Sequence, residues 1–175
     1  MNLPEEIAQL QGRLLRAGGR AVLIATAESA TAGRIADQLT GAPGASDYFL
    51  GGIVAYSNDA KMQLLGVGQS TLDQVGAVSA RVACEMADGG RAALGATVCV
   101  SDTGIAGPGG ATANKPVGLF FVGIATAEGS TAREFRFNGD RTSNKEAAAR
   151  ACLTLLRDYL LQCCDATGAN DDDSV

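Results

Sequence analysis

The sequence VLIATAESATAG, residues 22–33, is the stretch from which the fold of this chain can be inferred. A short apolar run leads into a turn of Ser, Thr and Gly, which is how α/β proteins present polar groups at the carboxyl end of a strand. The turn brings Glu28, Ser29 and Thr31 to the start of a helix expected over residues 32–39. The first N–H groups of that helix, together with its dipole, favour an anion or a developing negative charge above the turn. We therefore expect a pocket at this point of the fold.

Strand and helix patterns alternate on both sides of this stretch and end in a hairpin and a last helix. The expected strands cover residues 21–27, 48–56, 96–100, 118–126 and 131–137. The expected helices cover residues 3–17 and 32–39, a short segment from Asn58, a long segment after Ser79, and a final segment capped by Thr142 or Ser143. Another turn is expected to start at Ser70 or Thr71. The fold class is therefore α/β, a three-layer α/β/α sandwich with a mixed β-sheet, formed by a single domain over residues 1–164. The acidic tail 165–175 lacks periodicity and is expected to be disordered. Gly89 and Gly90 either weaken the long helix or mark close packing against a neighbour.

Composition excludes several classes of function. The net charge is −5 and no basic run is present, which argues against a nucleic-acid partner, whereas a small phosphorylated ligand needs only one local cation. The chain contains no histidine, so triads with an imidazole base are excluded and no metal site is expected. Five cysteines without CxxC spacing fit free thiols in a reducing cytoplasm. No signal peptide is visible and the apolar runs are too short for a membrane span, so no membrane partner is expected.

Three polar clusters carry candidate chemistry. They are Glu28 to Thr31, then Ser46 with Tyr56 and Lys61, and finally Asp102 to Gly104 with the following glycines and Lys115. Without histidine, a hydrolytic serine needs another base, and a lysine whose pKa is lowered by desolvation can serve, with a tyrosine assisting proton transfer. The glycine-rich loop after Val100 offers backbone N–H groups to an oxyanion or a phosphate, although it matches neither GxGxxG nor the P-loop pattern. Each cluster also has a purely structural interpretation, as helix caps, packed aromatics or turn residues.

Taken together, the segments AESATAG, GASDYFLGGIVAYSNDAK, GAVS, TGIAGPGG, KPVG and GDR, in this order and spacing, resemble the CinA C-terminal amidase family. The resemblance covers residues 5–159, and the chain resembles a stand-alone form without the additional N-terminal domain of longer CinA proteins. Members include nicotinamide-nucleotide amidohydrolases. The resemblance implies hydrolysis of the carboxamide of nicotinamide mononucleotide to nicotinate mononucleotide and ammonia, by a metal-independent mechanism that needs no cofactor. Family members tend to associate, so a homo-oligomer is expected.

The resemblance also assigns roles to residues. Ser46, Tyr56 and Lys61 match a Ser/Tyr/Lys constellation, with Ser46 as the preferred nucleophile, Lys61 as base and Tyr56 assisting, while Ser29 competes for the nucleophile role. Arg141 is the natural cation for the 5′-phosphate, since its planar fork suits phosphate oxygens; its alternative is a salt bridge to Asp140 or the last helix. The remaining positions expected to bind substrate are Glu28, Thr31, Gly33, Thr103, Gly104, Gly107 and Gly109.

One departure from the family pattern leaves other functions open. Relatives commonly have ESxTGG, whereas this chain has Ala32 before Gly33, which adds a Cβ where the backbone would approach a ligand. A non-catalytic nucleotide-binding or regulatory module of the same fold is the alternative function, and an amidase for another pyridine or nucleotide amide is a third. The sequence leaves both a covalent acyl-enzyme and direct attack by water possible.

Overall fold

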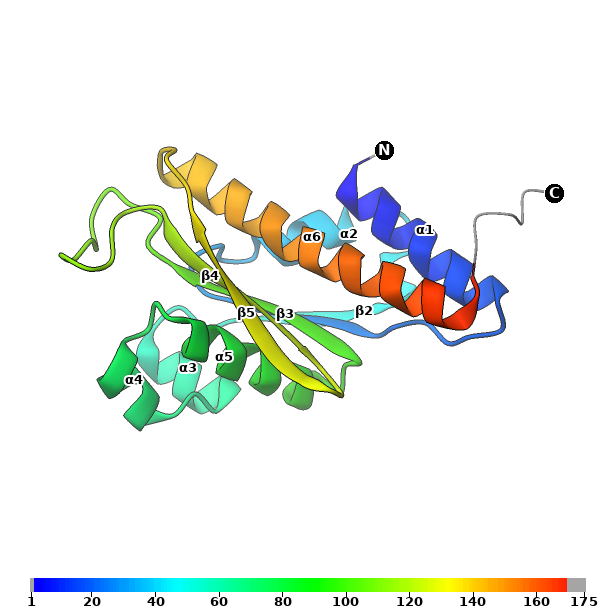
Figure 1. Cartoon of the computed structure of the whole chain (residues 1–175), viewed down its shortest axis with the longest axis horizontal. Helices are drawn as coiled ribbons and strands as arrows, with labels where there is room; N and C mark the ends of the chain where they lie inside the picture. The colour runs from blue at the N-terminus through cyan, green and yellow to red at the C-terminus, as the bar shows by residue number, and fades with distance from the viewer. Residues whose placement is uncertain (1, 170–175) are drawn as a thin grey trace.

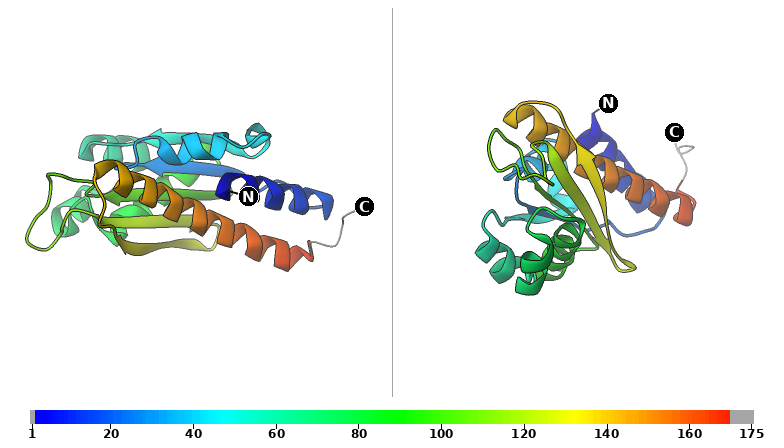
Figure 2. Two further views of the ribbon diagram at one scale, coloured as in Figure 1. Left: turned by 90° about the horizontal axis from the view of Figure 1, so that it is seen from above. Right: turned by 60° about the vertical axis from the view of Figure 1, so that its left-hand side comes forward.

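A mixed five-stranded sheet lies between two layers of helices, as shown for residues 2–169 by the computed structural model (Figure 1). The strand order is β2-β1-β3-β4-β5, and the bounds are β1 (Ile24–Glu28), β2 (Phe49–Val54), β3 (Val98–Gly104), β4 (Leu119–Thr126) and β5 (Gly129–Arg136). One face carries α1 (Leu3–Arg16), α2 (Arg34–Thr40) and α6 (Arg141–Thr167), and the other carries α3 (Asn58–Leu65), α4 (Gln69–Val75) and α5 (Ala80–Leu94), as the labels of Figure 1 show; Figure 2 gives two further views of these layers. The predicted α/β/α sandwich with a mixed sheet is confirmed.

The direction of the strands gathers the polar clusters at one edge of the sheet. Strand β1 pairs in parallel with both β2 and β3, so the carboxyl ends of these three strands lie side by side. Every residue of β1 is buried, as expected for a central strand covered on both faces. Strand β4 runs antiparallel to β3, so the segment 105–118 that joins them, here called the glycine-rich loop, lies at the same edge.

Strand β3 is longer than the sequence predicted. Apolar patterning ended the expected strand at Val100, but the observed strand continues through Ser101–Gly104. The extra residues pair with β4 down to Gly104 opposite Phe120, and this long-range pairing is what keeps a polar, glycine-containing segment extended. Asp102 and Thr103 are therefore strand residues and not loop residues.

Helix α1 begins and ends as its sequence predicts. Asn2 accepts a hydrogen bond from Glu5 N–H, and the Glu5 carboxylate accepts one from Asn2 N–H, which completes a capping box. The apolar side of α1 packs against α6 and joins the core cluster on this face of the sheet through residues that include Ile7 and Leu10. The buried Gln11 side chain bonds to both the N–H and the carbonyl of Val22, which fixes the entry into β1.

Close packing explains the two glycines of α5. A Cβ added at Gly89 would lie 1.9 Å from the carbonyl oxygen of Leu65, at the end of α3, and one added at Gly90 would lie 2.8 Å from the Cys99 sulfur. The interpretation of this pair as a site of close packing is therefore the correct one.

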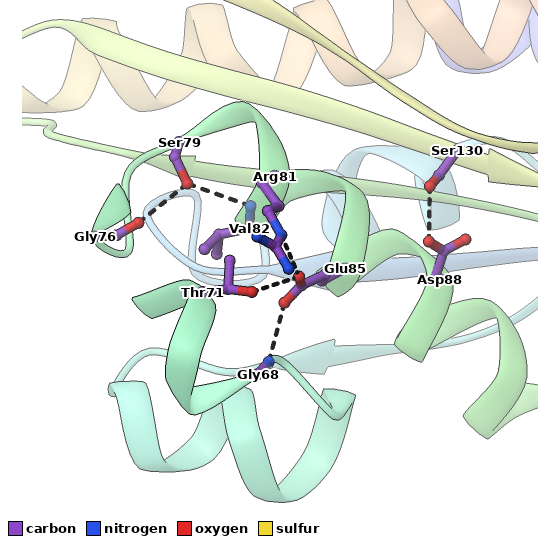
Figure 3. A network of polar contacts seen from close by, with 9 residues as sticks. All are labelled: Gly68, Thr71, Gly76, Ser79, Arg81, Val82, Glu85, Asp88 and Ser130. Carbon is purple, nitrogen blue, oxygen red and sulfur yellow. Dashed lines mark hydrogen bonds and ion pairs between the residues drawn. The ribbon is translucent and has the colours of Figure 1, made fainter. Parts of the chain in front are cut away.

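A polar network joins α4 to α5 (Figure 3). The Glu85 carboxylate accepts hydrogen bonds from Gly68 N–H and the Thr71 hydroxyl, and Ser79 caps α5 while donating to the carbonyl of Gly76. These bonds fix both ends of the short connection that contains residues 77 and 78. That connection forms one wall of the pocket described below.

The last helix differs from the prediction at both ends. Its N-cap is Asp140, which accepts from Ser143 N–H, and not Thr142 or Ser143. The helix continues to Thr167, and Ala169 is buried in the core, so the expected boundary at residue 164 lies inside α6. The rest of the expected tail, 170–175, lies outside the described residues. Within residues 2–169 no helix is long and apolar enough to cross a membrane.

Candidate active site

A cavity of about 250 Å³ opens at the carboxyl edge of β1, β2 and β3. Its walls come from the residues after β1, the connection from β2 to α3, the connection from α4 to α5, the glycine-rich loop and the first residue of α6. The lining residues are Ser29, Ala30, Tyr56, Asn58, Lys61, Ala77, Val78, Thr103, Gly104, Ile105, Ala106, Gly107, Gly109, Gly110 and Arg141. Ligands of α/β proteins bind at this edge of the sheet.

A buried lysine contacts a serine at the base of this cavity. Lys61, 2% exposed, places its Nζ 2.9 Å from the Ser29 Oγ, and the same nitrogen donates to the carbonyls of Ala55 and Tyr56 at 3.0 Å each. Three acceptors match the three N–H bonds of an ammonium group, whereas the neutral amine leaves a lone pair for the serine proton. The pair therefore has the geometry of a nucleophile and its base.

Electrostatics adjust the proton affinity of this lysine. Burial lowers the pKa of the Lys61 ammonium, and the negative charge of Asp102 offsets part of that effect by raising it. A lysine pKa below its usual range increases the fraction of neutral amine near neutral pH.

Two buried carboxylates build the turn at residues 29–33, here called the Ser29 turn. The Asp102 carboxylate accepts the N–H groups of Ser29 at 3.0 Å and Thr31 at 3.1 Å, and it also contacts the Thr31 hydroxyl. The Glu28 carboxylate accepts the Thr31 hydroxyl at 2.7 Å and the Thr26 hydroxyl at 3.2 Å. Both carboxylates are completely buried.

The start of α2 does not offer its donors to a ligand. The N–H groups of Gly33, Ile35 and Ala36 donate to the Glu28 carboxylate at 2.7, 3.1 and 2.9 Å. The expectation of an anion above this helix is therefore wrong, because the side chain of Glu28 already supplies the negative charge. Neither Glu28, Thr31 nor Gly33 lines the cavity, so the structure places these three expected substrate-binding residues in the support of the turn.

The backbone conformation at Ala32 favours glycine, the residue that the family resemblance implies at this position. Ala32 is exposed and has φ +54°, in the left-handed region that favours glycine. It does not line the cavity, so its Cβ does not obstruct a ligand there. The departure affects backbone strain in the turn and not the shape of the pocket.

Ser46 lies at the opposite edge of the sheet. It is exposed within the 3₁₀ turn Ala45–Asp47, before β2 begins, whereas Tyr56 and Lys61 follow the end of that strand. The six residues of β2 span about 20 Å at a rise of about 3.3 Å per residue. The prediction that Ser46 acts with Lys61 is therefore wrong in its geometry, and Ser29 is the serine that contacts the lysine.

Tyr56 contacts the cavity in a different way from the expected one. Its backbone carbonyl accepts from Lys61, but its side chain is 59% exposed and its hydroxyl contacts the Arg141 guanidinium at 3.1 Å. Arg141 also donates to the carbonyl of Gly107 at 2.7 Å. Within residues 2–169 it pairs with no carboxylate, so the alternative of a salt bridge to Asp140 or to α6 is not observed. The Arg141 guanidinium lines the cavity.

Eight of the predicted site residues line the cavity: Ser29, Tyr56, Lys61, Thr103, Gly104, Gly107, Gly109 and Arg141. Sequence reasoning missed Asn58 and the connection at residues 77–78. The Thr103 hydroxyl donates to the carbonyl of Ala77 at 2.8 Å, which joins that connection to β3. These positions lie within the motif segments GAVS and GASDYFLGGIVAYSNDAK, but no local feature assigned them to the site, because α4 and α5 bring the connection there from a distance.

Two backbone donors at the cavity have no acceptor. Ala30 and Ala106 are buried in one small apolar cluster and both line the cavity. Their N–H groups donate to none of the residues 2–169. A buried N–H without an acceptor is rare in folded proteins, and such groups beside a nucleophile are suited to a developing oxyanion.

The described residues form neither a disulfide nor a cluster of metal-ligating side chains. All five cysteines are free thiols, and Cys99, Cys152 and Cys164 are buried. Over the described part of the chain, no group of three or more His, Cys, Asp or Glu side chains is arranged to hold a metal ion.

Comparison with known proteins identifies one family over most of the chain. Residues 5–160 match the family model of the CinA C-terminal domain. A CinA-like protein of Salinibacter ruber is 54% identical over 142 residues, 81% of this chain and 34% of that protein. A putative competence-damage inducible protein of Halothermothrix orenii is 44% identical over 160 residues, 91% and 37% respectively. The crystal structure of the competence/damage inducible protein CihA from Agrobacterium tumefaciens has a TM-score of 0.81 at 38% identity, over 90% of this chain and 94% of that one. The chain spans about a third of the length of these two curated relatives.

Proposed function

Since this chain belongs to the CinA C-terminal domain family, we propose that it is an amidohydrolase that converts nicotinamide mononucleotide to nicotinate mononucleotide and ammonia. The observation that carries the proposal is the 2.9 Å contact between the buried Lys61 amine and the Ser29 hydroxyl inside the cavity. The substrate follows from the sequence resemblance and agrees with a pocket that is lined by the Arg141 guanidinium. A binding module needs no buried lysine beside a serine.

In the proposed reaction, neutral Lys61 takes the proton of Ser29 as Oγ bonds to the carboxamide carbon. The carbonyl electron pair moves to oxygen, where the free N–H groups of Ala30 and Ala106 stabilise the negative charge. The C–N bond then breaks, and the nitrogen receives the proton from Lys61 and leaves as ammonia. A water molecule attacks the resulting ester with Lys61 again as base, which releases the carboxylate and restores the serine.

The test is a coupled ammonia assay on the purified protein with nicotinamide mononucleotide, with no added metal and again with EDTA. We expect release of ammonia that continues in the chelator. Ser29→Ala should reduce kcat by about 10⁴-fold or more, the range found when a nucleophilic serine is removed. Ser46→Ala is the matched control and should leave the rate unchanged, since this side chain is exposed at the far edge of the sheet.

Two outcomes would count against the proposal. Binding of the mononucleotide without any ammonia release, by protein shown to be folded, would favour the non-catalytic module. Equal loss of activity in Ser46→Ala and Ser29→Ala would contradict the assignment of the nucleophile.

A further inference from the structure

Asp102 is completely buried beside the proposed active site, yet it does not line the cavity. It lies near the end of β3, and its carboxylate oxygens divide between two N–H groups of the Ser29 turn. Oδ1 accepts from Ser29 and Oδ2 accepts from Thr31. The backbone of the nucleophilic serine is thus tied to the neighbouring strand by one side chain.

The Thr31 hydroxyl links this carboxylate to a second one. It lies in contact with Asp102 Oδ1 and 2.7 Å from Glu28 Oε2. A hydroxyl has a single hydrogen, so it can donate to only one of the two oxygens at a time. Burial and then the charge of Glu28 raise the pKa of Asp102 to about 6, although hydrogen bonds from Thr31 and Ser29 oppose the rise. Near neutral pH Asp102 is therefore ionised but held close to its titration range.

The two partners of the catalytic contact are fixed by different strands. Lys61 Nζ is held by the carbonyls of Ala55 and Tyr56, which follow β2. Ser29 follows β1 and is held by Asp102 of β3. We propose that Asp102 is a positioning residue that fixes the backbone of Ser29 and so keeps its hydroxyl at the Lys61 amine. This inference rests on the proposed function.

A positioning role and a merely structural role of Asp102 can be distinguished by experiment, because the charge of Asp102 acts on the pKa of Lys61. Asp102 on β3 interacts with Lys61 on α3 and Glu28 on β1, Cys152 on α6 interacts with both carboxylates, and Tyr56 and Arg141 line the cavity. Among them, Asp102 is the group whose charge raises the pKa of Lys61. A residue that only stabilised the fold would not shift the pH dependence of the serine's reactivity.

Asp102→Asn is the test variant, because asparagine keeps the size of the side chain. The asparagine carboxamide offers one oxygen to the Ser29 turn, so it can accept only one of the N–H groups of Ser29 and Thr31. Its NH₂ group then faces the other N–H, and two donors cannot form a hydrogen bond. We expect kcat to fall by about 100-fold with little change in KM, as for a small displacement of a reacting group. Because Lys61 acts as base only when neutral, the rate rises with pH through its pKa. Loss of the negative charge lowers that pKa, so the rising limb should move to lower pH by about one unit.

A second readout does not depend on the substrate. Sulfonylation of Ser29 by phenylmethanesulfonyl fluoride, followed by peptide mass spectrometry, reports the reactivity of the serine with Lys61 as base. We expect slower labelling of Asp102→Asn with the same shift of its pH profile. Asp73→Asn, an exposed carboxylate on α4, is the matched control and should behave as wild type. If Asp102→Asn does not fold, Thr31→Val removes the linking hydroxyl at constant shape and should slow labelling, whereas Thr31→Ser should restore it.

The outcomes distinguish the two proposals. Wild-type kinetics and an unshifted pH profile in the folded Asp102→Asn protein would overturn the positioning role, as would wild-type labelling of Thr31→Val where it serves as the substitute. Slower, pH-shifted labelling in a protein that releases no ammonia from the mononucleotide would support the positioning role and reject the proposed substrate. Failure of wild type to be labelled at Ser29 would count against the nucleophile itself, and the kcat comparison would then decide the role of Asp102.

Discussion

Replacing Glu28 by glutamine removes one acceptor oxygen from the buried cap of α2 without changing the size of the side chain. In the structure, Oε2 accepts the N–H groups of Gly33 and Ile35 and the hydroxyl of Thr31, and Oε1 accepts the N–H of Ala36 and the hydroxyl of Thr26. The amide oxygen of glutamine can replace Oε2. Its NH₂ group then faces the N–H of Ala36, and two donors cannot form a hydrogen bond.

The expected loss of unfolding free energy in Glu28→Gln follows from these contacts. A buried N–H left without an acceptor costs about 1–3 kcal/mol, and each of the three remaining bonds loses about 1 kcal/mol when its acceptor becomes neutral. The neutral amide recovers part of this sum because it is cheaper to bury than a carboxylate. We therefore expect Glu28→Gln to lower the free energy of unfolding by about 3–5 kcal/mol, a large part of the stability of a domain of this size.

The assay is urea unfolding near neutral pH followed by far-UV circular dichroism, since the chain contains no tryptophan. Glu134→Gln on β5 is the control, because the Glu134 side chain is 44% exposed and pairs with Arg136 at the surface, and its effect should stay within about 0.5 kcal/mol. A loss below about 1 kcal/mol in Glu28→Gln, with an unchanged denaturant slope, would refute the reasoning from hydrogen bonds. A raised KM at full stability would instead support the original expectation that Glu28 binds substrate.

Three further changes test other parts of the structure. Ala32→Gly should raise the free energy of unfolding by about 1 kcal/mol, because the left-handed backbone at this position costs a residue with a Cβ that much, and a drop in stability would contradict the argument. Gly89→Ala should lower the free energy of unfolding by about 3 kcal/mol or more in the same urea titration, since the new Cβ would overlap the backbone carbonyl of Leu65. Arg141→Ala should raise KM for nicotinamide mononucleotide by about 10- to 100-fold, the value of a charge-assisted contact. KM for nicotinamide riboside, which lacks the phosphate, should stay nearly unchanged. Equal effects on the two KM values would show that Arg141 does not bind the phosphate.

The sequence by itself determined the parts of this protein that depend on neighbours along the chain. Periodic apolar residues and the Asn2–Glu5 cap are enough to define α1, and the alternation of strands and helices is enough to predict the sandwich. The absence of histidine, read with a lysine just after a strand, directed attention to Lys61 as a base. These features are local, because hydrogen bonds and side-chain contacts within a helix or turn join residues a few positions apart.

Only the tertiary structure decided which serine meets that lysine. Ser46 is closer to Lys61 in sequence, but a strand lies between them and carries them to opposite edges of the sheet, whereas the parallel pairing of β1 with β2 brings Ser29 alongside. Pairing of β3 with β4 placed Asp102 on a strand, under the Ser29 turn, where its sequence alone suggested a loop. Strand order and direction are set by burial of the whole sheet between two helical layers, and this long-range packing is not encoded in the spacing of any one motif.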